Sequence, residues 1–231
     1  MRYLRFFLFV VFALLFNILI VPPFILISLI TRKDRTLFAI YKIFLKISFF
    51  ILGIRVKVLG IENIPEPPFI IAPNHTSYLD PPALIMVISY NIRAMAKKSV
   101  FNIPILGIAL SIGKFIKVDR SSASRASKSF REAEKLLKSG IPLMIFPEGT
   151  RTYNGNLQRF KGGVARLSLK SGVPVVPTVI KGGFELLPRT ANIPKPGEIL
   201  IKFLPPIYPD KFNDASELNI ALRSAIEDAL G

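Results

Sequence analysis

The sequence contains no cysteine and no tryptophan, and only one histidine, His75. The absence of cysteine excludes disulfide bonds, thiolate metal sites and a cysteine nucleophile. A zinc site with several histidine ligands is excluded too, because the chain supplies one imidazole. We therefore expect no bound metal. Histidine is the side chain that normally titrates near neutral pH, so a catalytic base of that kind would have to be His75.

Charge is missing from a long run near the start of the chain, between Arg5 and Arg32. Hydrophobic residues make up 51% of the sequence, and the mean hydropathy is +0.45. Both values are high for a soluble protein, so part of the chain is expected to contact lipid. No small-residue cleavage site follows the run, and a second hydrophobic stretch comes directly after it. We therefore expect a retained anchor rather than a signal peptide.

The anchor is expected to consist of two helices. The first, over residues 6–21, would end before a pair of prolines and measure about 24 Å, which is less than the roughly 30 Å hydrocarbon core. The second, over residues 36–53, places Arg35, Lys42 and Lys46 in one stripe, which suits a helix lying in the membrane interface. We expect an element embedded in one leaflet, on the cytoplasmic face of an inner or plasma membrane. Two full spans are the alternative, with the same sidedness.

Positive charge extends over the whole chain. Lysine and arginine number 31 against 15 acidic residues, a formal net charge of +16. Such a field attracts anionic headgroups, phosphorylated metabolites, acidic carrier proteins or nucleic acid. A nucleic-acid-binding protein would explain the charge but not the anchor, and a transporter would need more spans. We therefore expect membrane lipid as a partner and no nucleic acid.

After residue 54, short apolar runs alternate with helical patterns, which is typical of an α/β domain. We therefore expect membrane-anchoring helices over residues 1–54 and an α/β domain over 55–231, with a mixed sheet flanked by helices. The strands are predicted at residues 55–59, 69–72, 92–96, 115–118, 143–146, 175–180 and 199–203. The helices are predicted at residues 81–90, 122–138, 163–171 and 215–230.

A histidine motif, Asn74-His75-Thr76-Ser77-Tyr78-Leu79-Asp80, follows one strand and precedes a helix. An imidazole can take a proton from an alcohol, and a nearby carboxylate can orient it and stabilise the imidazolium. His75 and Asp80 are thus a candidate catalytic pair. The alternative is that Asp80 caps the helix that begins at the prolines following it, with His75 a loop residue. The two roles are compatible.

Two further polar segments also follow strands, and the carboxyl ends of strands in α/β sheets are where ligands bind. One contains Asp119-Arg120, and the other is Phe146-Pro147-Glu148-Gly149-Thr150-Arg151. Arginine binds phosphate bidentately, so Arg120 and Arg151 are candidate phosphate ligands. The alternative for the second segment is a surface turn with ordinary ion pairs.

These blocks, with Val173-Pro174-Val175-Val176-Pro177 as the fourth, resemble in content and order the blocks of the glycerolipid acyltransferase family. The resemblance covers about residues 55–210 and is strongest to the 1-acyl-sn-glycerol-3-phosphate acyltransferases. It implies transfer of a fatty acyl group from a thioester to the sn-2 hydroxyl of 1-acylglycerol 3-phosphate (lysophosphatidic acid), giving phosphatidic acid. His75 would be the general base and Asp80 its orienting partner, with no covalent intermediate. The absence of a G-x-S-x-G motif agrees with this.

The same resemblance implies roles for the residues around the third block. Arg120 and Arg151 would bind the phosphate, and Glu148 would hold an arginine or receive a glycerol hydroxyl. Gly149 and Thr150 would supply donors, and Lys161 would contact the phosphate or the acyl donor. The fourth block is more typical of a buried strand, and only analogy with the family would assign it to the wall of an acyl-chain tunnel.

No cofactor is implied beyond the co-substrate, a thioester of acyl carrier protein or of coenzyme A. The alternatives are a related acyltransferase acting on glycerol 3-phosphate or another lysophospholipid and, in another class, a lysophospholipid hydrolase.

Overall fold

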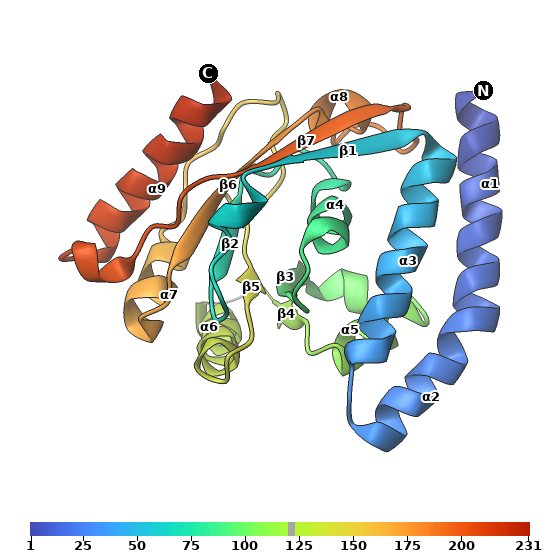
Figure 1. Cartoon of the computed structure of the whole chain (residues 1–231), viewed down its shortest axis with the longest axis horizontal. Coiled ribbons are helices and arrows are strands. Elements are labelled where there is room, and N and C mark those ends of the chain that lie inside the picture. The colour runs from blue at the N-terminus through green and yellow to red at the C-terminus, as the bar shows by residue number, and fades with distance from the viewer. Residues whose placement is uncertain (120–122) are drawn as a thin grey trace.

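The computed structural model describes residues 1–119 and 123–231, with side chains described for residues 1–119 and 127–231. The described residues form a seven-stranded mixed sheet between helical layers (Figure 1). The strand order is β1 (Ile54–Leu59), β7 (Gly197–Phe203), β6 (Val175–Lys181), β2 (Ile70–Pro73), β5 (Leu143–Met144), β3 (Arg93–Lys97) and β4 (Ile116–Val118). The predicted α/β fold and its strands are thus confirmed.

The five strands from β6 to β4 run parallel to one another, whereas β7 pairs antiparallel with β6 and parallel with β1. Strands β2 and β5 are direct neighbours. Their carboxyl ends therefore lie side by side, which brings the histidine motif next to the segment that follows β5. The ends of β3 and β4 lie farther along the same edge.

Helices cover both faces of the sheet (Figure 1). One face carries α3 (Arg35–Leu52) and α4 (Asp80–Val87), and its core contains Phe69, Leu84 and Ile201. The other face carries α6 (Ala123–Lys138), α7 (Gly163–Ser171) and α9 (Ala215–Leu230). The structure also contains two short helices that the sequence analysis did not predict, α5 (Leu106–Ile112) and α8 (Gly183–Leu186).

The first hydrophobic helix does not end at Pro22, and this prediction was wrong. A helix runs from Arg2 to Thr31, made of α1 (Arg2–Leu15), a π-helical segment (Phe16–Ile20) and α2 (Val21–Thr31). Proline clashes with the carbonyl four residues earlier in an α-helix. The wider π turn directly before the prolines avoids this clash, and α2 bends away from the axis of α1 (Figure 1).

This 30-residue helix is the one helix among the described residues that is long and apolar enough to cross a membrane. Its length is about 45 Å at the α-helical rise. The helix is therefore not too short to cross the hydrocarbon core, as the predicted length of about 24 Å implied.

Helix α3 runs back along α1 and packs on the sheet (Figure 1). Phe49 and Leu52 belong to the same buried core as the strands. Lys42, which was predicted to share one basic stripe with Arg35 and Lys46, is half-buried. Its Nζ donates hydrogen bonds to the backbone oxygens of Ile88 (2.7 Å) and Ser89 (3.1 Å), just after α4. The boundary at residue 54 coincides with the start of β1, but α3 shares the core of the α/β domain.

Candidate active site

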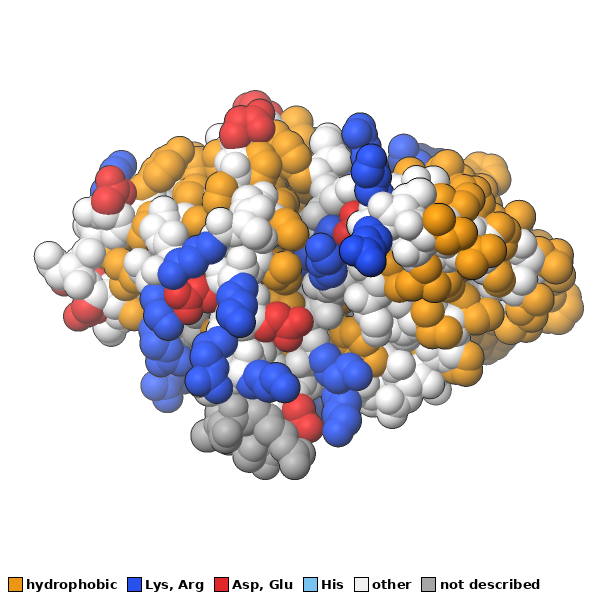
Figure 2. Space-filling view, turned by 90° about the horizontal axis from the view of Figure 1, so that it is seen from below, with side chains coloured by type: hydrophobic (Ala, Val, Ile, Leu, Met, Phe, Trp, Pro, Cys, Tyr) orange, Lys and Arg blue, Asp and Glu red, His pale blue; other side chains and the backbone are white. Residues whose placement is uncertain are grey.

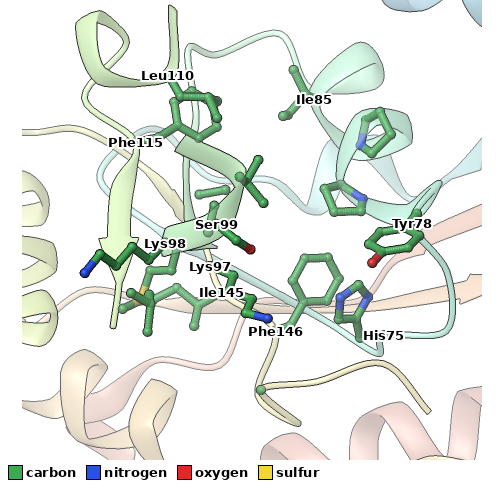
Figure 3. A pocket seen from close by; sticks show the side chains of 18 of the residues that line it. His75, Tyr78, Ile85, Lys97, Lys98, Ser99, Leu110, Phe115, Ile145 and Phe146 are labelled. Carbon is green, nitrogen blue, oxygen red and sulfur yellow. The ribbon is translucent and has the colours of Figure 1, made fainter. Parts of the chain in front are cut away.

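A cavity of about 1350 Å³ opens beside the carboxyl ends of β3, β4 and β5. Its floor is formed by the strands, and α3, α4 and α5 form much of its walls. Figure 3 shows His75 and Tyr78 at one end, with Ile85, Leu110 and Phe115 farther along. The cavity therefore has a polar end at the histidine motif and a long apolar part that reaches toward the N-terminal helices.

His75 and Asp80 form a hydrogen-bonded pair at the polar end. The Nδ1 atom of His75 lies 2.9 Å from Oδ2 of Asp80. The Asp80 side chain is fully buried, whereas 15% of the His75 side chain is exposed. Since Nδ1 faces the carboxylate, Nε2 is the ring nitrogen left for a ligand. The imidazole also stacks on the Phe146 ring, with 3.9 Å between centroids, so two contacts orient it.

Asp80 does not cap the helix that it begins. The same Oδ2 atom accepts hydrogen bonds from the backbone N–H groups of Thr76 (2.7 Å) and Ser77 (2.8 Å). Helix α4 has no side-chain cap at its start. The carboxylate therefore organises the loop that precedes it, and the helix-cap interpretation was wrong. Gly183 packs against this loop so closely that a Cβ there would lie 2.7 Å from Oδ1 of Asp80.

Buried polar side chains anchor this loop to the sheet and to α8. Asn74 donates from Nδ2 to the Ile180 carbonyl (3.0 Å) and accepts from the Ile180 N–H (2.7 Å). Ser77 donates from Oγ to the Leu187 carbonyl (2.9 Å). Both side chains are buried and serve the structure of the loop.

Glu148 is buried and does not line the cavity, but it contacts the loop that carries His75. Its Oε1 accepts the backbone N–H of His75 (2.7 Å), and its Oε2 accepts both the backbone N–H and the Nε2 of Gln158 (3.1 Å each). Burial raises the pKa of the Glu148 carboxyl, and these hydrogen bonds offset part of that rise. Glu148 thus holds the backbone of His75, a role that sequence reasoning did not propose.

Arg151 lines the cavity and stacks on the exposed ring of Tyr78, with 3.3 Å between Cζ and the ring centroid. Its Nη1 is buried and has no hydrogen-bond partner among the described residues. Gly149, Thr150 and Lys161 also line the cavity. The Lys161 side chain packs against Gly149: a Cβ added at Gly149 would lie 3.1 Å from Nζ of Lys161. The structure thus brings four of the predicted substrate ligands to one end of the cavity.

Arg189 was missed by the sequence analysis. It follows α8 and lines the cavity next to Arg151. Its Nη1 donates to the Thr150 hydroxyl (3.2 Å) and to the Arg151 carbonyl (3.1 Å). No motif surrounds it in the sequence, so only the fold shows that it reaches the site. Conversely, Arg120 lies outside the described residues.

The fourth block does not line the cavity, so its assignment by analogy to a tunnel wall was wrong. Val175 and Val176 belong to β6, are fully buried and form part of the cores on the two faces of the sheet. Apolar side chains of α3 and α5 line the cavity instead, among them Phe38, Phe44 and Leu110. Lys97 and Lys98, at the end of β3, also line it.

Comparisons with known proteins show which family this chain is similar to. The Acyltransferase family model matches residues 55–181. A 1-acyl-sn-glycerol-3-phosphate acyltransferase of Limnanthes douglasii is 33% identical over 161 residues, which are 69% of this chain and 57% of that protein. A protein of the same name from Pseudomonas aeruginosa is 32% identical over 157 residues, which are 68% of this chain and 60% of that protein. The chain thus matches a little over half the length of these curated relatives.

One solved structure is similar to this chain over nearly the whole length of both proteins. The crystal structure of the 1-acyl-sn-glycerophosphate (LPA) acyltransferase PlsC from Thermotoga maritima has a TM-score of 0.85 and 28% sequence identity. The similarity covers 99% of this chain and 96% of that one. The family model covers more than half of the chain, including the His75–Asp80 pair and Arg151. This chain therefore belongs to the acyltransferase family.

Proposed function

We propose that this protein transfers a fatty acyl group from a thioester to the sn-2 hydroxyl of 1-acylglycerol 3-phosphate, forming phosphatidic acid. One observation carries the proposal: His75, held by Asp80, lines the same cavity as apolar side chains of α3 and α5 and as the cations Arg151, Lys161 and Arg189. An acceptor with a fatty chain, a free hydroxyl and a phosphate fits these three features: the chain fits the apolar side chains, the hydroxyl fits His75, and the phosphate fits the cations. The names of the relatives support the same substrate.

In the proposed reaction, Nε2 of His75 takes the proton of the sn-2 hydroxyl as the oxygen attacks the thioester carbonyl. The tetrahedral intermediate then collapses, the carbon–sulfur bond breaks, and the thiolate takes the proton from the imidazolium. Asp80 holds the ring through Nδ1 and stabilises its positive charge. Ser77 is an unsuitable nucleophile, because its hydroxyl already donates to the Leu187 carbonyl and accepts from the Leu79 N–H. Direct attack by the acceptor is therefore the simpler scheme.

Arg151 is the proposed phosphate ligand, with Lys161, Gly149 and Thr150 around it and Arg120 as a further candidate. Burial lowers the pKa of the Arg151 guanidinium, and the neighbouring Arg189 lowers it further. A dianionic phosphate would compensate both the buried charge and the unpaired Nη1.

The N-terminal helices are proposed to hold the protein in the membrane. Along Arg2–Thr31 many large hydrophobic side chains are exposed, including Leu4, Phe7, Leu8, Leu14, Ile18, Leu19, Leu26 and Ile30. Figure 2 shows hydrophobic side chains over the end of the molecule that holds these helices, with basic side chains gathered beside them. An apolar surface bordered by cations fits a bilayer with anionic headgroups. We propose the cytoplasmic face of the inner or plasma membrane as its location.

The acyl donor is proposed to be a thioester of acyl carrier protein or of coenzyme A. A purified, detergent-solubilised enzyme should be assayed with both donors against lysophosphatidic acid, glycerol 3-phosphate and lysophosphatidylglycerol. We expect the highest kcat/KM with lysophosphatidic acid. Preference for glycerol 3-phosphate, or release of free fatty acid as the main product, would contradict the proposed function.

A further inference from the structure

Two guanidinium groups, rather than one, line the cavity near His75: those of Arg151 and Arg189. Arg151 stacks on Tyr78, with 3.3 Å between Cζ and the ring centroid, and Arg189 stacks on Tyr153, with 3.9 Å. Both tyrosines are exposed, at 64% and 68%. Stacking uses the face of a guanidinium and leaves its edge donors free. Each half-buried arginine is thus held flat against a tyrosine ring, and the edge N–H groups that make no hydrogen bond within the protein can bind a ligand.

Arg189 is fixed to the loop that carries Arg151. Both hydrogen bonds given by Arg189 come from Nη1, to the Thr150 hydroxyl and the Arg151 carbonyl. In the part of the chain that the structure describes, its Nη2 and Nε have no such partner and are not enclosed. Three of the five N–H donors of this guanidinium are therefore free.

The site holds more positive charge than its protein neighbours compensate. Arg189 and Arg151 form no salt bridge with any described carboxylate. Two adjacent cations repel each other unless an anion lies between them. A phosphomonoester carries a charge of about −1.5 to −2 at neutral pH, whereas a phosphodiester carries one negative charge. The pair therefore matches the charge of a phosphomonoester.

We propose that Arg189 is a second phosphate ligand, which together with Arg151 makes the enzyme select acceptors with a dianionic phosphomonoester over acceptors with a phosphodiester. This inference rests on the proposed function, since it concerns the acceptor of the same reaction. Arg189 lies outside the four sequence blocks, and the proposal gives it the role of recognising the charge of the acceptor phosphate.

The test compares two acceptors that both have a free sn-2 hydroxyl, lysophosphatidic acid and lysophosphatidylglycerol. Arg189→Gln should raise the KM for lysophosphatidic acid by about tenfold or more, the fold-change that corresponds to about 1.4 kcal/mol of a charged hydrogen bond. The KM for lysophosphatidylglycerol and the kcat should change little. Arg159→Gln is the matched control, because Arg159 is exposed and does not line the cavity.

The pH dependence separates phosphate binding from a purely structural role. The second pKa of a phosphomonoester is about 6, so the wild-type KM for lysophosphatidic acid should rise as the pH falls from 7.5 to 5.5. In Arg189→Gln this rise should become smaller, because the variant no longer distinguishes the dianion as strongly. Arg159→Gln removes a positive charge that does not line the cavity, so it should retain the wild-type slope.

Three results have distinct meanings. A wild-type enzyme that does not prefer lysophosphatidic acid would contradict the proposed function itself. A preference in the wild type that survives unchanged in Arg189→Gln would overturn only the role of Arg189. An equal fall in kcat with both acceptors, with a lowered melting temperature, would show that Arg189 supports the loop and does not bind phosphate.

Discussion

Asp80 contacts both the imidazole of His75 and the loop that carries it, through a single oxygen. Oδ2 lies 2.9 Å from Nδ1 of His75 and accepts two backbone N–H groups from the residues that follow. A change in the position of this carboxylate would therefore move the ring and the loop together. On the other side, Glu148 accepts the backbone N–H of His75 (2.7 Å). Two buried carboxylates thus determine where the proposed base lies.

Replacing His75 removes the proposed base. General-base catalysis is worth about 10²–10⁴ in rate, and the chain has no second histidine. We expect His75→Ala to lower kcat by about that factor, measured as phosphatidic acid formed by the purified enzyme. Sedimentation with vesicles should be unchanged. Near-normal acyl transfer by this variant would refute the proposed mechanism.

Asp80→Asn tests charge separately from shape. An asparagine oxygen in the position of Oδ2 can keep the two bonds from the loop, but it does not supply the negative charge that stabilises an imidazolium. We expect kcat to fall by about 10²–10⁴ with little change in the melting temperature.

Asp214 is the matched control for a true helix cap. It accepts the backbone N–H groups of Ser216 (2.6 Å) and Glu217 (3.0 Å) at the start of α9. Asp214→Ala should lower stability by about 0.5–2 kcal/mol and leave kcat unchanged. If Asp80→Asn behaved like Asp214→Ala, Asp80 would have only a structural role.

Arg151→Ala should weaken the use of a phosphorylated acceptor. The expected loss is about 1.5–3 kcal/mol, the range for hydrogen bonds to charged groups. It should appear in kcat/KM for lysophosphatidic acid, while the KM of the acyl donor stays close to normal. Monoacylglycerol, which lacks the phosphate, is the control acceptor. An equal loss with monoacylglycerol would exclude a phosphate-binding role.

A larger side chain on the cavity floor should limit the acyl chain. Ala96 lies on β3 and lines the cavity, so Ala96→Leu would occupy space that a chain is proposed to fill. Each buried CH₂ contributes about 0.8 kcal/mol, so long acyl chains should lose more rate than short ones. Rates with a series of chain lengths measure this. A uniform loss for every length would place the chain elsewhere.

Charges on the exposed apolar surface should weaken membrane binding. Phe7 on α1 and Phe50 on α3 are 62% and 82% exposed, and burial of each in lipid is worth about 1.5–3 kcal/mol. The double variant Phe7→Glu, Phe50→Glu should therefore bind anionic vesicles more weakly. Ile220→Glu on α9 is the control, because Ile220 is similarly exposed, at 62%, but lies on the other side of the sheet. Equal binding of all three proteins would contradict the anchor proposal.

Removing the N-terminal segment is a less specific test of the anchor. Phe49 and Leu52 belong to the core, and Lys42 holds the chain after α4. Deleting residues 1–53 should therefore lower stability and open the cavity, in addition to any effect on membrane binding. Thermal unfolding of the truncated protein would show this loss.

Local patterns in the sequence were enough to predict the strands, most helices and the His75–Asp80 pair. Apolar runs of the right length form strands wherever both faces are covered. The spacing of His75 and Asp80 lets one loop bring them together, which needs little help from distant residues. Where the prediction failed within a helix, at Pro22, the reason was also local: a π turn accommodated the prolines, and the hydrophobic pattern does not reveal such a turn.

The tertiary structure alone decided which distant residues complete the site. Glu148 reaches His75 because β2 and β5 are neighbours. Arg189 reaches Arg151 because the chain after α8 lies against the loop that follows β5. Helix α3 provides a wall of the cavity because it packs on the sheet. These contacts join segments far apart in the chain, and their geometry depends on strand order and packing. A sequence pattern reports the neighbours of a residue along the chain, and only the fold reports its neighbours in space.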